Sequence, residues 1–302
     1  MGDGSGAVRF AHFSDVHLTS SRLGWTRRTL LGKQVTGWMN VKVLGRGHRF
    51  RFAPLVTDAM IAEIRADAPD GVIFSGDATT LAFESEFHAS ANRLSVGDPG
   101  PAGFAVAGNH DYYTHAAWYR GHFEKRFAAW QEGLRLDDQP YPFARKIGHA
   151  WLIGLNTSTA NLWPWDASGR AGDAQLARLR KLAEQLDAGP RILVTHYPLR
   201  KADGQLERRG HRLRDHAATL EAARDAKIGL WLHGHIHQGF VLEPTRDIPF
   251  PIVNAGSCTQ TNLWSYNRYT LTGHALDATR RTFDVATQKF ADAGTFRLTL
   301  PT

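Results

Sequence analysis

Polar side chains of the types that bind metal ions follow five short apolar runs in this sequence. They lie in the segments SDVH (14–17), SGDA (75–78), GNHD (108–111), THYP (195–198) and HGHIH (233–237). A single Asp at such a position is usually a helix cap, so one motif alone would indicate little. The five together bring carboxylate, amide and imidazole groups into one chain, and that mixture is suited to divalent Mn, Fe, Zn or Co.

The apolar runs are predicted to be β-strands that alternate with helices. Strands are expected at 8–15, 71–77, 104–110, 191–196 and 228–235. Helices are expected at 54–68, from about 84, at 114–130, at 173–187 and up to about 226. The runs FARKI and AWLIGLN form a predicted hairpin, and 239–302 reads mostly as strands and turns. This alternation favours a layered α/β fold, in which polar groups gather at the carboxyl edge of the strands.

In their order, the motifs D-x-H, G-D, G-N-H-D, H and G-H-x-H resemble those of the calcineurin-like metallophosphoesterase family. The resemblance extends over about residues 8–260. It implies a metal-dependent phosphoric ester hydrolase, folded as a four-layer αββα sandwich of two mixed sheets flanked by helices. We expect a single domain over 1–302. The segment SDVHL (14–18) is similar to the bacterial branch that contains cyclic-nucleotide phosphodiesterases and UDP-2,3-diacylglucosamine hydrolases.

The same resemblance implies a dinuclear metal centre, with Mn or Fe expected and Zn or Co as alternatives. Asp77 would bridge the ions, because two cations about 3.5–4 Å apart need a shared anion between them. The further ligands would be Asp15, His17 and His237 for the first ion, and Asn109, His196 and His235 for the second. A hydroxide held between the ions would be the nucleophile that attacks phosphorus.

His110 follows the implied ligand Asn109 and resembles the family's histidine that faces the substrate. We expect His110 to protonate the leaving group or to stabilise its charge, and Asp111 to orient the imidazole. Some relatives of this family have lost ligands and become protein-binding scaffolds. Every expected ligand is present in this chain, so catalysis is favoured over a scaffold role.

A basic segment interrupts the pattern directly after the first motif. Residues 22–52 contain eight Lys or Arg side chains and no carboxylate, whereas the whole chain has a net charge of only +7. We predict an insertion, or cap, over 18–53. Its apolar residues Leu31, Val35, Trp38 and Met39 have helical spacing, but five glycines interrupt it, so a broken helical cap is expected rather than one rod.

A basic amphipathic cap is suited to an anionic membrane surface, and it favours a lipid-linked phosphodiester or pyrophosphate as substrate. The candidate substrate contacts are Arg27, Arg28, Trp38, Arg49 and Arg51. A solvated basic loop is the alternative for this segment, and a cyclic-nucleotide phosphodiesterase is the alternative function. Nucleic acid is less expected as a partner, because the rest of the chain is close to neutral. No protein partner is inferred.

Bulk composition is consistent with a folded protein in a reducing compartment. The 302 residues are 42% hydrophobic, which is ample for a sizeable core. The single cysteine, Cys258, excludes an intrachain disulfide and is predicted to be a small buried hydrophobe. The sequence has neither the pattern of a secretory signal nor a run of about 18 apolar residues. We therefore expect a cytoplasmic protein, with possible peripheral contact to the membrane.

Overall fold

Two six-stranded sheets form the centre of the computed structural model, which describes residues 6–163 and 165–301, with Arg28 and Arg46 described by their backbone only. The first sheet has the order β12-β11-β10-β1-β2-β3, and the second has the order β4-β5-β6-β7-β9-β8. The first consists of β1 (Val8–Phe13), β2 (Gly71–Phe74), β3 (Ala102–Ala105), β10 (Ser265–Thr272), β11 (Ala275–Asp284) and β12 (Lys289–Thr299). The second consists of β4 (Phe143–Ile147), β5 (Ala150–Gly154), β6 (Arg191–Val194), β7 (Leu230–His233), β8 (Phe240–Leu242) and β9 (Ile252–Asn254).

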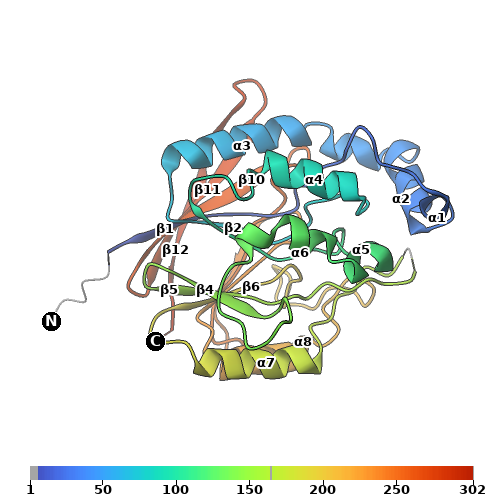
Figure 1. The fold of residues 1–302 in the computed structure, drawn as a ribbon. Coiled ribbons are helices and arrows are strands. Elements are labelled where there is room, and N and C mark those ends of the chain that lie inside the picture. Colours follow the sequence, from blue (N-terminus) through green and yellow to red (C-terminus); the bar gives the residue numbers. More distant parts are fainter. Residues whose placement is uncertain (1–5, 164, 302) are drawn as a thin grey trace.

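Helices cover the outer face of each sheet (Figure 1). The helices α3 (Ala53–Asp67) and α4 (Glu84–Arg93) pack on the first sheet, and α7 (Asp173–Glu184) and α8 (His216–Asp225) pack on the second. Apolar side chains of the two sheets meet in a third cluster between them, which includes Phe10 and Phe104 from the first sheet and Leu152, Val194 and Leu232 from the second. This arrangement confirms the predicted four-layer αββα sandwich of mixed sheets.

The strand β1 illustrates why these sequences lie in the middle of such a fold. Val8 and Phe10 pack between the sheets, whereas Ala11 and Phe13 pack on the helix side. Successive side chains of a strand point to opposite faces, so a strand that is buried on both faces is mostly apolar; in β1 only Arg9 is exposed, and the buried His12 is hydrogen-bonded to Ser75 and Tyr269. Each fully buried Phe contributes roughly 1.5–3 kcal/mol relative to an exposed one.

The parallel strands end at the same level, and this positions the polar motifs. Phe13 at the end of β1 pairs with Phe74 of β2, and Phe74 pairs with Ala105 of β3. In the second sheet, Val194 of β6 pairs with Leu232 of β7. The residues that follow these strands therefore meet at one edge of the sandwich, as predicted for a layered α/β fold.

The predicted insertion is a broken helical segment, as expected. It contains α1 (Arg27–Leu30), α2 (Lys33–Lys42) and the 3-10 helix η1 (Arg46–Phe50). Gly32 separates the first two, and Gly45 enters η1 with a φ of 76°, which residues with a Cβ rarely adopt. Figure 1 shows α1 and α2 at the right of the view, at the end of the molecule opposite to the labels of β1 and β12. Among the described residues, no helix is both long and apolar enough to cross a bilayer.

One prediction of secondary structure was wrong. The expected helix over 114–130 consists of three short pieces, α5 (His115–Tyr119), α6 (His122–Arg126) and η2 (Ala128–Trp130), and Gly121 separates the first two in a left-handed conformation with φ 59°. The strand β12, with eleven residues, lies in the part 239–302 that was expected to be rich in strands, but no bounds were predicted for it. Most of its side chains are exposed at the edge of the sheet, so it lacks the apolar signal of a buried strand.

Candidate metal centre

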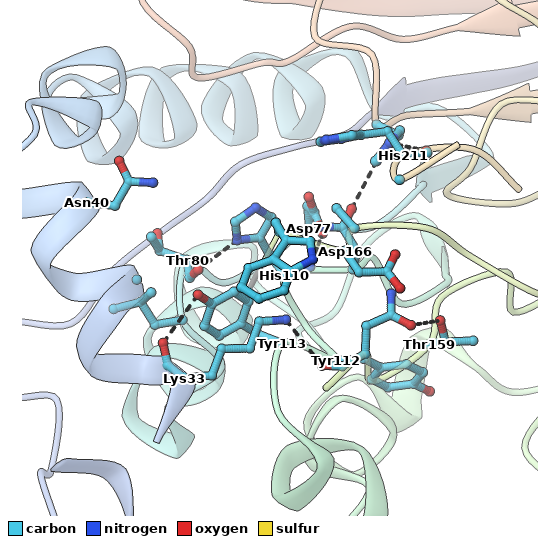
Figure 2. A pocket seen from close by; sticks show the side chains of 18 of the residues that line it. Lys33, Asn40, Asp77, Thr80, His110, Tyr112, Tyr113, Thr159, Asp166 and His211 are labelled. Atoms are coloured by element: carbon cyan, nitrogen blue, oxygen red, sulfur yellow. Dashed lines mark hydrogen bonds between the residues drawn. The ribbon is translucent and has the colours of Figure 1, made fainter. Parts of the chain in front are cut away.

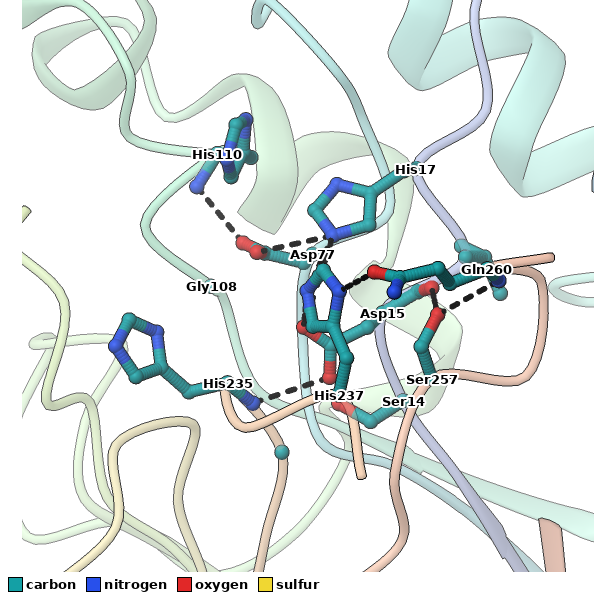
Figure 3. Close-up of polar contacts among 12 residues, drawn as sticks. Ser14, Asp15, His17, Asp77, Gly108, His110, His235, His237, Ser257 and Gln260 are labelled. Atoms are coloured by element: carbon teal, nitrogen blue, oxygen red, sulfur yellow. Dashed lines mark hydrogen bonds and ion pairs between the residues drawn. The ribbon is translucent and has the colours of Figure 1, made fainter. Parts of the chain in front are cut away.

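The first group of predicted ligands converges on Asp15 and Asp77 (Figure 3). His17 Nε2 lies 3.7 Å from Asp15 Oδ1 and 3.6 Å from Asp77 Oδ2. His237 Nε2 lies 3.3 Å from Asp15 Oδ1 and 3.3 Å from His17 Nε2. Two residues after β1 and one residue of the loop after β7 are thereby brought together with the loop after β2.

The second group of predicted ligands lies on the other side of Asp77. His196 Nε2 is 3.4 Å from Asp77 Oδ2 and 3.1 Å from Asn109 Oδ1. His235 Nδ1 is 2.9 Å from the same Asn109 oxygen. Asp77 is thus the residue that both groups share, in the arrangement that a bridging ligand requires. Asp15, Asp77 and Asn109 follow strands of the first sheet, whereas His196 and His235 follow strands of the second.

Several of the predicted ligands have a strained backbone conformation. Asp15, His17, Asp77 and His235 all have positive φ values, of 55°, 42°, 64° and 68°. Such conformations cost roughly 1–3 kcal/mol each in non-glycine residues and persist only where the surroundings enforce them. Here the backbone N–H groups of Asp15 and His17 donate to the carbonyls of Gly76 and Asp77 at 2.9 and 3.0 Å. The two motif loops therefore hold each other in the strained form.

The glycines of the motifs permit close contact between these loops. A Cβ on Gly108 would lie 2.1 Å from Asp77 Oδ1, and one on Gly234 would lie 1.8 Å from Ser14 Oγ. Neither distance can be tolerated, because real Cβ contacts under 3.0 Å essentially do not occur. The Gly in G-N-H-D and in G-H-x-H is therefore required by packing against the neighbouring motif.

Oxygen acceptors fix the orientation of three of the imidazoles. His196 Nδ1 lies 2.8 Å from the carbonyl of Ser75, and His235 Nε2 lies 3.0 Å from the carbonyl of His211. His237 Nδ1 contacts the side-chain oxygen of Gln260. Each of these nitrogens must carry the proton, since the partner only accepts. The remaining nitrogen of each ring faces the oxygens of Asp15, Asp77 or Asn109, where it could donate its lone pair to a metal ion, as is usual for metal-ligating histidines.

The donor set fits a pair of divalent ions. Metal bonds of about 2.0–2.2 Å to nitrogen and oxygen place the ligand atoms of one ion roughly 3.0–3.5 Å apart, close to the separations observed here. The buried Asp15 Oδ1 has no hydrogen-bond donor among the described residues, so a cation would satisfy it. Burial alone would raise the pKa of Asp77, but His196 and His110 more than reverse this and hold the pKa well below its usual range. Asp77 is therefore an anion.

A comparison with models of protein families shows to which family the chain belongs. The model of the calcineurin-like phosphoesterases matches residues 8–239 of the chain. This chain is a calcineurin-like phosphoesterase. It is accordingly a metal-dependent hydrolase of phosphoric esters, and the Asp and His clusters suit the dinuclear site of that family. A search of curated proteins gives no match.

Solved structures share the fold of this phosphoesterase at low sequence identity. A dimetal phosphatase from Danio rerio has a TM-score of 0.68 at 12% identity, with 97% of this chain and 99% of that chain covered. The purple acid phosphatase PPD1 from yellow lupin has a TM-score of 0.61 at 12% identity, covering 98% of this chain and 54% of that one. GAP50, the anchor in the inner membrane complex of Plasmodium, has a TM-score of 0.56 at 13% identity, covering 98% and 90%.

The contacts of Asp111 in this phosphoesterase differ from the prediction that it orients His110. Its Oδ2 accepts from the backbone N–H groups of Gly108 and Asp77 at 2.8 and 3.0 Å, and its Oδ1 accepts from that of Thr79 at 3.0 Å. The imidazole of His110 is instead held at Nδ1, 2.7 Å from the carbonyl of Thr80. Burial, together with the charge of Asp77, raises the pKa of Asp111 to about 7. Asp111 thus organises the loop backbone around Asp77.

A pocket of about 820 Å³ opens beside the centre and contains His110 (Figure 2). Of the described residues of the insertion, those that line it are Lys33, Gly37, Asn40 and Val41. The predicted contacts Arg27, Trp38, Arg49 and Arg51 lie outside this lining, and the side chain of Arg28 lies outside the described part of the chain. Trp38 packs against Trp25 instead, with ring centroids 6.2 Å apart.

Several residues of the site were not predicted. Phe50 from η1 covers His17, with ring centroids 4.6 Å apart, and Gln260 contacts His237. The run NAGSC (254–258) before Gln260 also lies close to the centre, since Ser257 Oγ donates to the carbonyl of Asp15 at 2.8 Å. Cys258 is buried, as predicted. A polar run at the end of a late strand was the one available signal for this region.

Proposed function

We propose that this phosphoesterase hydrolyses a phosphodiester or pyrophosphate bond of a lipid-linked substrate at a dinuclear centre. Asp77 would bind both ions, which we expect to be Mn or Fe, with Zn or Co as alternatives that also suit the donor set. The proposed further ligands are Asp15, His17 and His237 for one ion, and Asn109, His196 and His235 for the other. The observation that carries the dinuclear centre is the set of three imidazoles whose distal nitrogens are fixed by oxygen acceptors.

When bound, the two ions would neutralise charge on the phosphoryl oxygens and lower the pKa of a water that attacks phosphorus. The protein's own contribution is orientation. Asp77 Oδ1 accepts from the backbone N–H of His110 at 2.7 Å, which fixes the carboxylate plane. His110 carries a proton on Nδ1, because the carbonyl of Thr80 only accepts there. We assign Nε2 of His110 as the atom that faces the leaving oxygen and stabilises its charge.

Exposed apolar side chains on the insertion support a lipid-linked substrate. They are Leu30, Leu31, Met39, Val43 and Leu44, with exposed fractions from 49% to 91%. Exposed basic residues such as Arg27, Lys42 and Arg49 belong to the same segment. Clustered exposed apolar groups within a basic segment are typical of elements that lie on an anionic bilayer surface. Peripheral contact with such a surface, on the cytoplasmic side, is part of this proposal.

A second segment beside the pocket also exposes large apolar side chains. Leu162, Trp163 and Trp165 are exposed by 75%, 59% and 71%. This segment lies next to α2, since Lys33 Nζ donates to the carbonyl of Asn161 at 3.3 Å. Trp165 also lines the pocket. Exposed Trp side chains are enriched at membrane interfaces, so both segments support entry of the substrate from a lipid surface.

Turnover of three substrates by one Mn-loaded preparation tests the proposal. UDP-2,3-diacylglucosamine in mixed micelles is expected to be hydrolysed with a higher kcat/KM than cyclic AMP or bis(p-nitrophenyl) phosphate. The double variant Leu31→Glu, Leu44→Glu should lose activity on the lipid substrate and keep activity on the aryl diester. Val285→Glu, at an exposed residue that follows β11, is the matched control. A clear preference for cyclic AMP, or equal loss in the control, would refute the lipid assignment.

A further inference from the structure

Lys33, the first residue of α2, reaches from the insertion into the pocket that contains His110 (Figure 2). Its Nζ lies 4.4 Å from the centroid of the Tyr113 ring and 3.3 Å from the carbonyl oxygen of Asn161. The ring of Tyr113 is in turn parallel to that of His110, with centroids 5.9 Å apart and an angle of 7° between the planes. The ring of Tyr113 therefore contacts both the ammonium group and the imidazole next to the metal centre.

The position of Lys33 is fixed by contacts of α2 with the loops that form the pocket. The Tyr113 hydroxyl donates to the carbonyl of Lys33 at 3.3 Å, and Gln34 Nε2 donates to the carbonyl of Leu81 at 3.2 Å. A Cβ on Gly37 would lie 2.6 Å from a methyl of Leu81, so the helix lies directly on this loop. Much of the side-chain entropy cost of placing an ammonium group here is therefore met on folding.

The ammonium group of Lys33 forms no ion pair with a carboxylate in the described part of the chain, although Asp166 is close enough for its charge to act on Lys33. No carboxylate oxygen in the described part of the chain lies within 4.0 Å of its Nζ, whereas the surface residue Lys146 lies 2.6 Å from Asp187. Asp166 also lines the pocket, but its carboxylate accepts from the backbone and hydroxyl of Ser168 at 2.9 and 2.6 Å. Burial lowers the pKa of Lys33, and the charge of Asp166 opposes this. A partly desolvated cation of this kind gains from an incoming anion.

We propose that Lys33 binds a second anionic group of the substrate, next to the phosphoryl group that is hydrolysed. This inference rests on the proposed function and narrows it: the substrate is a pyrophosphate diester, with an anionic phosphate on each side of the scissile bond, rather than a diester with one charge. The pocket of about 820 Å³ is large enough for the additional phosphate and the group attached to it. Lys33 is then the residue by which the insertion selects the substrate.

Competitive inhibition tests this role without requiring turnover of the pyrophosphate. The Mn-loaded protein hydrolyses bis(p-nitrophenyl) phosphate in the presence of ADP-ribose, a soluble pyrophosphate diester, and the inhibition constant is measured. For Lys33→Met, which keeps the aliphatic stem, the inhibition constant should rise about 10- to 100-fold, the range for loss of a charge-assisted hydrogen bond. The rise in the inhibition constant should exceed any change in the KM for the aryl diester, because that substrate has no second anionic group for Lys33 to bind. Lys33→Arg should recover much of the inhibition.

The matched control is Lys42→Met, at an exposed cation at the end of the same helix that lies outside the pocket lining. It should leave the inhibition constant unchanged. Equal effects of Lys33→Met and Lys42→Met, an equal loss on the aryl diester, or no inhibition of the wild type by ADP-ribose would each overturn the role of Lys33. Absence of aryl diester hydrolysis by the wild type with Mn or Fe would instead refute the proposed phosphodiester activity.

Discussion

Replacement of Gly108 by Ala is the sharpest test of the metal centre. The added Cβ would lie 2.1 Å from Asp77 Oδ1 and 2.3 Å from the backbone nitrogen of Asp77. Ordinary contact begins near 3.4 Å, so the carboxylate must move by about 1.3 Å. Metal sites tolerate deviations of only about 0.2 Å in bond length, and therefore Asp77 would lose contact with at least one ion. We expect Mn affinity to fall at least tenfold, or about 1.4 kcal/mol.

Two measurements on chelator-treated protein check this expectation. Isothermal titration with Mn gives the affinity, and thermal unfolding without metal gives the cost of the extra methyl, expected to be about 1–3 kcal/mol for overpacking. Gly294→Ala in β12 is the control, because a Cβ there meets no atom within 4 Å. Gly108→Ala protein that binds Mn as tightly as the wild type and the control would show that Asp77 is not the shared ligand.

Two further substitutions test residues around the site. Gln260→Ala removes the acceptor of His237 Nδ1 and should lower Mn affinity about 10- to 100-fold in titration calorimetry with little change in far-UV circular dichroism; unchanged affinity would contradict its orienting role. Glu86 is fully buried, and burial raises its pKa to about 7. Between its unfolded value near 4.5 and about 7, the folded wild type holds a proton that the unfolded chain has released, so its stability falls as the pH rises. In denaturant titrations, the free energy of unfolding of Glu86→Gln relative to wild type should rise by about 3 kcal/mol across that pH range. A difference between the two proteins that does not change with pH would refute the raised pKa of Glu86.

The layered α/β class and the convergence of the polar motifs could be predicted from the sequence, because both depend on where the apolar runs end, whereas the four-layer arrangement was implied by the family resemblance. Asp15, Asp77, Asn109 and His196 each follow an apolar run closely, and the structure places those runs side by side in two sheets. The family resemblance then supplied how the ligands divide between the ions. The bounds of β12 could not be predicted, because its exposed edge position removes the apolar pattern of a buried strand.

The contacts of the insertion could not be predicted in this way. Its charge and exposed apolar residues indicated Arg27, Arg49 and Arg51 as substrate contacts, whereas Lys33 reaches the pocket and Phe50 covers His17. Which cation of a basic segment turns inward depends on the packing of Gly37 and Gln34 against Leu81, far away in the sequence. Tertiary contacts of this kind leave no periodic signal.

The predicted ligands come from both sheets, with Asp15, Asp77 and Asn109 on one side and His196 and His235 on the other. Two bound metal ions would therefore link the first sheet to the second. Each of the two proposed ions would take ligands from both sheets, so its full set of ligands can form only after the two sheets have docked. The metal ions would then bind late in folding, after the two sheets have docked. Their binding would stabilise the docked sheets against separation.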